Sequence, residues 1–213
     1  MSKTTIGIVN CGIGNFQSLT NALRFISDST LVVTDDINQL DSCDRLILPG
    51  VGSFSSASSS DNINKLSRLI KSSLSQGRPV LGICLGMQLL FQSSSEGGTN
   101  PGLSFFHGDV IHFTEHGSYS LESNLLIPHV GLNTVKIVQD NRLFHNIPDN
   151  SKFYFTHSYH APSSVTSAIG LTDYGGCLFT SAASSGCIHA VQFHPELSGK
   201  IGLQLLTNFI SAH

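Results

Sequence analysis

The segment Pro79-Val80-Leu81-Gly82-Ile83-Cys84-Leu85-Gly86-Met87-Gln88 decides the fold and points to the chemistry. An apolar run of strand length enters a Gly-x-Cys-x-Gly turn, and a helical pattern follows over residues 85–91. This order of strand, tight turn and helix is typical of a nucleophile elbow in which Cys replaces the more usual Ser. Glycine flanks the nucleophile because so tight a turn leaves no room for a Cβ atom. The segment therefore predicts that Cys84 is a nucleophile.

Two features of the turn suit a reactive thiol. The positive end of the helix that follows favours the thiolate form of Cys84. The backbone N–H of Leu85 can also point at an oxyanion that develops on an acyl substrate. The alternative is a buried structural cysteine in an ordinary βα turn, and the turn alone leaves both interpretations open.

A second motif, Ala190-Val191-Gln192-Phe193-His194-Pro195-Glu196, supplies the partners that a nucleophile needs. Positions two apart in an extended chain point the same way, so Glu196 can reach the ring of His194. Pro195 keeps His194 extended. Alone, the motif also fits a strand end with a surface ion pair. Together with the cysteine turn it predicts a triad of nucleophile, base and orienting carboxylate at Cys84, His194 and Glu196.

Strand and helix signals alternate through the first half of the chain, which predicts a parallel sheet covered by helices. The second half is richer in strands. We therefore predict a single α/β domain over residues 1–213, with a doubly wound, mostly parallel central sheet, flanking helices and added β hairpins. Ligands of such sheets bind at the C-terminal ends of strands, where both motifs fall. The expected strands are residues 4–10, 31–33, 45–48, 79–83, 109–113, 134–138, 153–156, 167–172, 177–181 and 188–193; the expected helices are 16–26, 62–74, 85–91 and 200–210, with a turn at 11–14 and a flexible loop at 53–60.

The composition argues against several classes of protein. Charged residues make up 12% of the 213 residues, the formal net charge is -3, and no run is rich in Lys and Arg, so nucleic acid is not an expected partner. The N-terminus does not have the pattern of a signal peptide, and no apolar run is long enough to span a bilayer, so no membrane contact is expected. Five cysteines without a CxxC pair predict free thiols in the cytoplasm.

The other cysteines and histidines predict neither a metal site nor a cofactor. Cys43, Cys177 and Cys187 lie in or beside apolar stretches and are expected to be small core residues, whereas Cys11 lies in a turn. The remaining histidines are expected at the surface or in the core because they lack metal-ligand spacing, in particular His107, His112, His116 and His129.

The two motifs, about a hundred residues apart, resemble those of the class I glutamine amidotransferases. The resemblance covers nearly the whole chain and is greatest to the glutaminase subunits of imidazole glycerol phosphate synthases. The segment Leu48-Pro49-Gly50-Val51-Gly52-Ser53-Phe54 discriminates best between branches of the family. Further matching segments are Gly12-Ile13-Gly14-Asn15, Ile127-Pro128-His129-Val130-Gly131-Leu132-Asn133 and Phe155-Thr156-His157-Ser158-Tyr159.

The resemblance implies a role for each site residue. Cys84 would attack the side-chain amide of glutamine and form a γ-glutamyl thioester, His194 would protonate the leaving ammonia and then activate water, and Glu196 would hold the His194 tautomer. Oxyanion donors would come from Leu85 and from the strand with Gly50, Val51 and Gly52. The amino-acid end of glutamine would be held by Gln88 and the backbone of Ser158 and Tyr159.

The resemblance also implies a partner. Ammonia would pass to a (β/α)₈ cyclase subunit in a heterodimer of histidine biosynthesis, and the isolated glutaminase would be nearly silent. This sequence departs from the family pattern at three places: Asn10-Cys11-Gly12 replaces Asp-Tyr-Gly, Leu132 replaces Trp, and Leu197 replaces Lys. The Trp and Lys positions face the synthase in the family, so these changes concern docking and ammonia passage.

Three alternatives remain at this point. A paralogous glutaminase would supply ammonia to a different synthase, such as one that amidates surface sugars. An esterase or cysteine peptidase on a related α/β fold would use the same triad on another substrate. A catalytically inactive regulatory subunit would be expected to lack a triad member, and all three are present.

Overall fold

Parallel strands form the centre of the sheet in the computed structural model, which describes residues 3–10, 16–50, 52–119 and 125–211. Two central strands are buried along their whole length, as expected where helices cover both faces of a sheet. The parallel strands lie in the order β2 (Thr30–Thr34), β1 (Thr5–Val9), β3 (Arg45–Leu48), β4 (Val80–Ile83) and β13 (Ile188–Val191).

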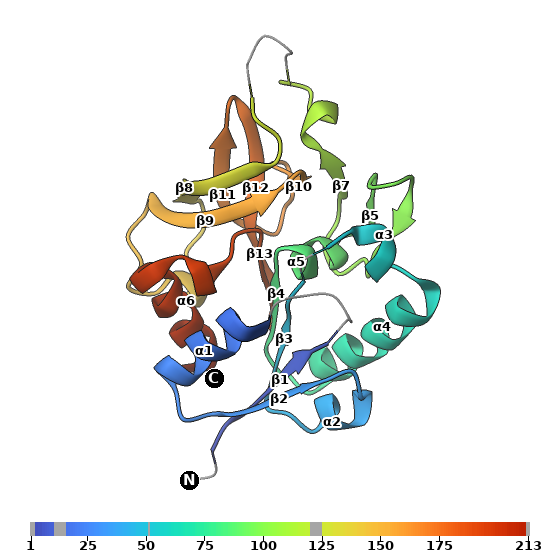
Figure 1. The fold of residues 1–213 in the computed structure, drawn as a ribbon, viewed down its shortest axis with the longest axis vertical. Coiled ribbons are helices and arrows are strands. Elements are labelled where there is room, and N and C mark those ends of the chain that lie inside the picture. Colours follow the sequence, from blue (N-terminus) through green and yellow to red (C-terminus); the bar gives the residue numbers. More distant parts are fainter. Residues whose placement is uncertain (1–2, 11–15, 51, 120–124, 212–213) are drawn as a thin grey trace.

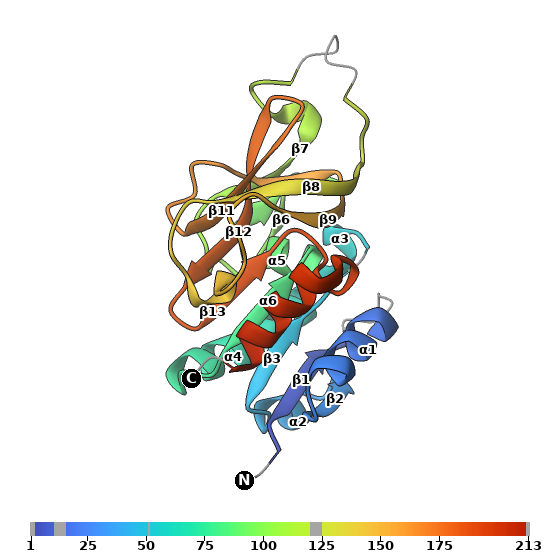
Figure 2. The same cartoon turned by 90° about the vertical axis from the view of Figure 1, so that its left-hand side faces the viewer.

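Helices cover both faces of these strands (Figures 1 and 2). On one face α1 (Phe16–Ile26) packs against α6 (Gly199–Ser211). On the other face α2 (Ile37–Asp41) packs against α4 (Ser60–Ser75). Two short helices, α3 (Phe54–Ala57) and α5 (Leu85–Leu89), follow β3 and β4 and lie beside each other. The C-terminal ends of β3 and β4 are therefore neighbours.

An antiparallel part extends the sheet and forms the upper half of the molecule in Figure 1. Strand β12 (Cys177–Ser185) joins the two parts, because it pairs antiparallel with β13 on one side and with β10 (Tyr159–Pro162) on the other. It also pairs with β11 (Ala168–Tyr174), which leads to β8 (His129–Ile137) and β9 (Ser151–His157). The sheet ends in β7 (Asp109–His112), β5 (Ser93–Ser94) and β6 (Asn100–Pro101). The described residues also include the 3₁₀ turns η1 (Phe113–Glu115), η3 (Arg142–Phe144) and η4 (Pro195–Leu197).

The predicted α/β class with a mostly parallel centre is confirmed, but the prediction of a flexible loop over residues 53–60 is wrong. That stretch contains α3 and the start of α4. Ser53 caps α3 by accepting a hydrogen bond from the Ser56 backbone N–H, and the fully buried Phe54 anchors the turn. Serine thus acts here as a helix cap, so a serine-rich composition misled the prediction.

Other differences concern short elements and boundaries. Strand β8 begins at His129, five residues before the expected strand, because pairing with β9 extends through that position. Helix α5 ends at Leu89 instead of residue 91. The sequence pattern did not predict α2, β5, β6 or β10, each of five residues or fewer. The predicted turn at 11–14 and Val51 lie outside the described residues.

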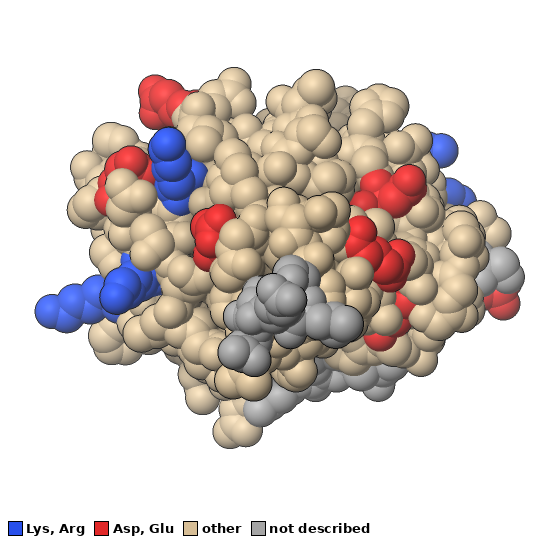
Figure 3. Space-filling model, turned by 90° about the horizontal axis from the view of Figure 1, so that it is seen from above, with Lys and Arg blue, Asp and Glu red and all other residues tan. Residues whose placement is uncertain are grey.

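Few charges mark the surface. Seen from above, the β-rich end carries acidic side chains at separate places and basic side chains near its margins, and most of its described surface is uncharged (Figure 3). Within the part of the chain that the structure describes, no helix is long and apolar enough to cross a membrane.

Candidate active site

Cys84 lies on the tight turn between β4 and α5. Its backbone N–H donates to the Val191 carbonyl at 2.8 Å, and its backbone adopts φ 53° and ψ -110°. Such a conformation is strained for a residue with a Cβ and is typical of functional sites. A Cβ at Gly86 would lie 1.7 Å from the Leu48 carbonyl oxygen, so only glycine allows α5 to approach β3 this closely.

His194 follows β13, the parallel neighbour of β4. Because the two strands run in the same direction, His194 comes to the same edge of the sheet as Cys84. Its backbone N–H donates to the Tyr154 carbonyl at 2.8 Å, and the preceding Phe193 stacks on Phe153 with ring centroids 4.0 Å apart. Nδ1 of the buried ring lies 2.8 Å from Glu196 Oε1. Nε2 is therefore the ring nitrogen left for Cys84.

The charge state of His194 depends on these two neighbours. Burial lowers its pKa, but interaction with the Cys84 and Glu196 side chains outweighs burial and raises the pKa of His194 to about 10. The imidazolium form is thus favoured beside a thiol, which is the arrangement that activates cysteine nucleophiles. A thiol, an imidazole and a carboxylate in this order can perform acyl transfer.

A cavity of about 320 Å³ opens beside Cys84. Residues from distant parts of the chain meet around it, and five of them were predicted as substrate-binding or oxyanion residues besides Cys84 itself: Gly52, Leu85, Gln88, Ser158 and Tyr159. The remaining wall consists of Glu96, Pro128, Thr156 and His157. His194 and Glu196 are not among the described residues that line the cavity.

The predicted oxyanion donor is engaged by a protein group. The Leu85 N–H donates to the Gly50 carbonyl oxygen at 3.4 Å, and a Cβ at Gly50 would come within 2.8 Å of the Leu85 Cβ. The segment after β3 therefore presses its peptide against the start of α5. In this conformation the Gly50 carbonyl oxygen accepts the Leu85 N–H, which is the donor that an oxyanion would need.

Two polar side chains at the site were not found from the sequence. Glu96 Oε2 accepts a hydrogen bond from the Phe54 N–H at 2.6 Å, and the carboxylate faces the same cavity as Cys84. Gln192 is fully buried, and its Nε2 lies 3.7 Å from Cys84 Sγ. Glu96 was the one acidic residue in a neutral stretch, and Gln192 lay inside the second motif, two positions before His194, but neither pattern assigns a role.

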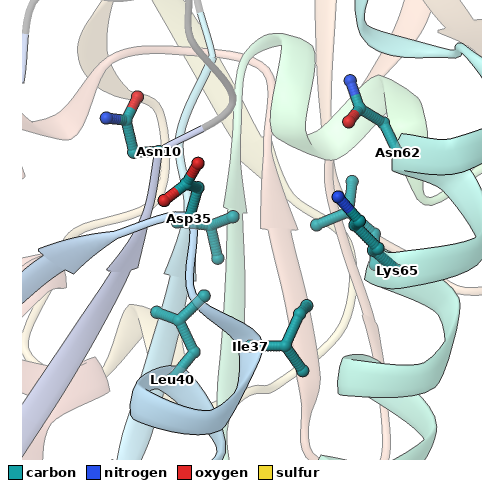
Figure 4. Close-up of a pocket in the computed structure, with 8 residues that line it drawn as sticks. Asn10, Asp35, Ile37, Leu40, Asn62 and Lys65 are labelled. Atoms are coloured by element: carbon teal, nitrogen blue, oxygen red, sulfur yellow. The ribbon is translucent and has the colours of Figure 1, made fainter.

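A second cavity, of about 210 Å³, lies where β1 and β2 end (Figure 4). Asn10 and Asp35 lie on one side of it and Asn62 and Lys65 on the other, above an apolar floor that includes Ile37 and Leu40. The described lining holds no thiol and no imidazole. None of the predicted triad residues is among the described lining of this second cavity.

Comparison with known proteins agrees with this geometry. The family model for "Glutamine amidotransferase class-I" matches residues 7–212. The imidazole glycerol phosphate synthase subunit HisH of Methanocaldococcus jannaschii is 41% identical over 205 residues, covering 96% of this chain and 98% of that protein. The subunit of the same name from Chlorobaculum tepidum is 40% identical over 203 residues, with 95% and 97% covered.

Solved structures share the fold at lower identity. The structure of PurLQS from Thermotoga maritima matches with a TM-score of 0.70 at 16% identity, covering 98% of both chains. The glutaminase domain of Trypanosoma brucei CTPS matches with a TM-score of 0.65 at 15% identity, covering 97% of this chain and 94% of that one. The chain belongs to the class I glutamine amidotransferase family, among its imidazole glycerol phosphate synthase HisH subunits.

Proposed function

We propose that this chain is the glutaminase subunit of an imidazole glycerol phosphate synthase, acting as one domain in the cytoplasm. The observation that carries the proposal is the cavity that Cys84 lines together with a carboxylate, Glu96, that can bind an ammonium group. Full-length identity near 40% to proteins named as HisH subunits supports the same pathway, histidine biosynthesis.

The proposed reaction follows from the triad. The Cys84 thiolate attacks the carboxamide carbon of glutamine, and the tetrahedral intermediate expels ammonia as the C–N bond breaks and His194 delivers the proton. The γ-glutamyl thioester then reacts with water, from which His194 takes a proton, and glutamate leaves as the C–S bond breaks. Glu196 keeps the His194 proton on Nδ1 and orients Nε2 toward sulfur through their 2.8 Å contact.

Recognition of the amino-acid end is assigned to polar groups that line the cavity together with Cys84. Glu96 supplies a negative charge for the α-ammonium group, and the side-chain oxygen of Gln88 can accept a hydrogen bond from the same group, because both Gln88 N–H groups are donated to Tyr159 and Gln192. The Ser158–Tyr159 backbone lies at the same cavity and offers hydrogen bonds to the α-carboxylate. A substrate without the free ammonium group would leave Glu96 without its counter-charge, and this distinguishes glutamine from a peptide or a simple ester.

The contact between Leu85 and Gly50 bears on regulation. Because the Gly50 carbonyl holds the Leu85 N–H at 3.4 Å, an oxyanion can bind only after that peptide moves. We therefore expect the isolated chain to hydrolyse glutamine slowly. Docking of a (β/α)₈ cyclase subunit would move the segment after β3 and expose the donor.

Exposed apolar side chains near the site favour a docking surface of particular chemistry. Leu132 is 63% exposed, Val130 55% and Leu197 46%. Tyr154 on β9 pairs with Leu132 on one side and with His194 on the other, so β8 and the segment after β13 both adjoin β9. An apolar partner surface would fit them better than one that relies on an ion pair. The family's Trp and Lys are both replaced here, which also favours a second candidate, a paralogous glutaminase that supplies ammonia to a different synthase, such as one amidating surface sugars.

Reconstitution separates the two candidates. The purified chain is mixed with a histidine-pathway cyclase, and glutamate release and imidazole glycerol phosphate are measured. We expect strong stimulation of both by the cyclase. No stimulation would exclude the histidine pathway, while labelling of Cys84 by the glutamine analogue 6-diazo-5-oxo-norleucine would still establish a glutaminase that serves another acceptor. Failure of that labelling would exclude the glutaminase itself.

A further inference from the structure

Polar side chains of the antiparallel part form a chain of hydrogen bonds that reaches the cavity wall at His157. It begins at Asn133 on β8, whose Oδ1 accepts from the Thr134 backbone N–H at 2.7 Å. This bond orients the amide, so Nδ2 is the atom that faces the Asp173 carbonyl at 2.9 Å and His129 Nε2 at 3.3 Å. His129 Nε2 must therefore accept, and its ring proton lies on Nδ1.

The tautomer of His129 also determines the tautomer of a second histidine, His157. His129 and His157 are paired residues of β8 and β9, which lie side by side in Figure 1, and His129 Nδ1 lies 3.0 Å from His157 Nε2. Since His129 donates from Nδ1, His157 accepts at Nε2 and carries its own proton on Nδ1. That nitrogen lies 2.8 Å from the Tyr159 carbonyl oxygen, to which it donates.

The Tyr159 carbonyl is also the point where the chain meets the glutamine cavity. Gln88 Nε2 donates to the same oxygen at 2.9 Å and to Gln192 Oε1 at 3.1 Å. Gln192 in turn donates from Nε2 to Cys84 Sγ at 3.7 Å. The Tyr159 carbonyl oxygen therefore accepts two hydrogen bonds, one from His157 and one from Gln88.

We propose that Asn133, His129 and His157 form a positioning relay that holds the Tyr159 peptide and Gln88 in the orientation that binds glutamine. The proposal rests on the glutaminase function proposed above. His129 does not line the cavity, so it acts through His157 and is a positioning residue. The relay begins on β8, the strand that also exposes Val130 and Leu132, and it therefore connects the proposed docking surface with the substrate site.

The surroundings support neutral imidazoles with one defined tautomer. Burial lowers the pKa of His129 to about 4 and brings the pKa of His157 well below its usual value. Aromatic rings pack on His129 and hold its orientation. The distance between ring centroids is 3.9 Å to Tyr174 and 4.7 Å to Phe155, and both rings are stacked on the imidazole. Among the described residues, no group of three or more His, Cys, Asp and Glu side chains is placed to hold a metal ion, so a metal does not explain the pair.

The first test reads the tautomers directly. In protein labelled with ¹⁵N-histidine at pH 7, the imidazole shifts should show protonated Nδ1 and unprotonated Nε2 for both His129 and His157, assigned with a His→Phe variant of each. A proton on Nε2 of either ring would overturn the relay. This measurement needs no substrate and is independent of activity.

The second test separates positioning from packing in the complex with the cyclase. His129→Phe keeps the stacked ring but removes the Nδ1 donor, whereas His129→Asn places an amide donor near that position. We expect His129→Phe to raise the KM for glutamine about fivefold to tenfold with kcat changed less than twofold, the size of one lost hydrogen bond. His129→Asn should return the KM to within about twofold of the wild type.

A matched control is His189→Phe, a histidine on β13 that bonds Ser184 and lies outside the relay. An unchanged KM in His129→Phe, or an equal rise in His129→Asn or His189→Phe, would overturn the inference. If His129→Phe fails to fold, Asn133→Ala at the relay's start should raise the KM in the same direction, and no rise would overturn it. Wild-type chain that forms no thioester at Cys84 would overturn the proposed function and the relay with it.

Discussion

Two regions of the molecule use histidine in opposite ways. Where β4 and β13 end, His194 lies between a thiol and a carboxylate, and its pKa is raised to about 10. In the antiparallel part, His129 and His160 are surrounded by aromatic rings, and burial lowers the pKa of each to about 4. The first region is built for charge and proton transfer, and the second is built for a neutral framework that holds positions.

The comparison shows that chemistry and positioning come from different kinds of sequence information. The first region comes from two short motifs that each end a parallel strand. The second needs β8, β9 and β10, whose partners lie far apart in the chain. Four predictions test this division, and the changes with the largest effects come first.

Removing the nucleophile should have the largest effect. Cys84→Ala should lower glutaminase activity in the cyclase complex by at least about 10³-fold, because no other group can form the thioester. Glutamine should still bind, as calorimetry would show, since Glu96 and the other residues that line the cavity are unchanged. Cys177→Ala, at another buried cysteine, serves as the control. Ammonia release by Cys84→Ala at the wild-type rate would contradict the assignment.

Glu96→Gln tests the proposed binding of the α-ammonium group in the cavity beside Cys84. The change keeps the shape and removes the counter-charge for the α-ammonium group, so the KM for glutamine should rise by about 10-fold to 100-fold. Steady-state kinetics should show a much smaller change in kcat, because Glu96 does not approach the scissile amide. Glu115→Gln, at an exposed carboxylate that bonds Ser95, is the matched control. Equal effects of the two substitutions would rule out a specific role for Glu96.

The opposite pKa shifts predict opposite effects of pH on stability. His160 and His189 have folded-state pKa values of about 4, below the ordinary 6.5, so their contributions are present above pH 6.5 and are lost as pH falls toward 4. His194, with a pKa of about 10, contributes fully below pH 6.5, and its contribution is lost as pH rises toward 10. Each buried imidazole should change the free energy of unfolding by about 1 kcal/mol per pH unit within its window.

Urea unfolding between pH 4.5 and 9.5 measures how the free energy of unfolding changes on the acid limb, below pH 6.5, and on the alkaline limb, above pH 6.5. His160→Phe should flatten the acid limb alone, and His194→Gln the alkaline limb alone. If either variant flattened both limbs, the two regions would not be electrostatically separate.

The docking surface should give the smallest effect. Leu132→Ser should weaken binding of the partner subunit about fivefold to tenfold by removing an exposed apolar contact, as titration of the complex would show. The basal glutaminase activity of the isolated chain should not change, because Leu132 does not line the cavity. Val138→Ser, at an exposed apolar residue just beyond β8, is the control. Weakening of similar size in both variants would argue against a defined surface at Leu132.

The short motifs made much of the parallel half predictable. Gly86 follows Cys84 because a Cβ there would strike the Leu48 carbonyl, so local sterics dictate the pattern. The helix at Phe16–Ile26 was predicted to the residue from apolar spacing at Leu19, Leu23 and Ile26. Short pieces such as α2 and β10 were missed because periodicity needs more residues than they contain.

The sequence by itself determined the nucleophile turn, the His-x-Glu pair and the class of fold, because each depends on neighbours within a few residues. Only the tertiary structure decided that Glu96 lines the same cavity as Cys84, that the Gly50 carbonyl accepts the Leu85 N–H, and that His129 Nδ1 contacts His157 Nε2. Those contacts join residues whose separation is set by strand pairing. A one-residue shift in the register of β8 against β9 would turn His129 away from His157, and no local pattern specifies that register.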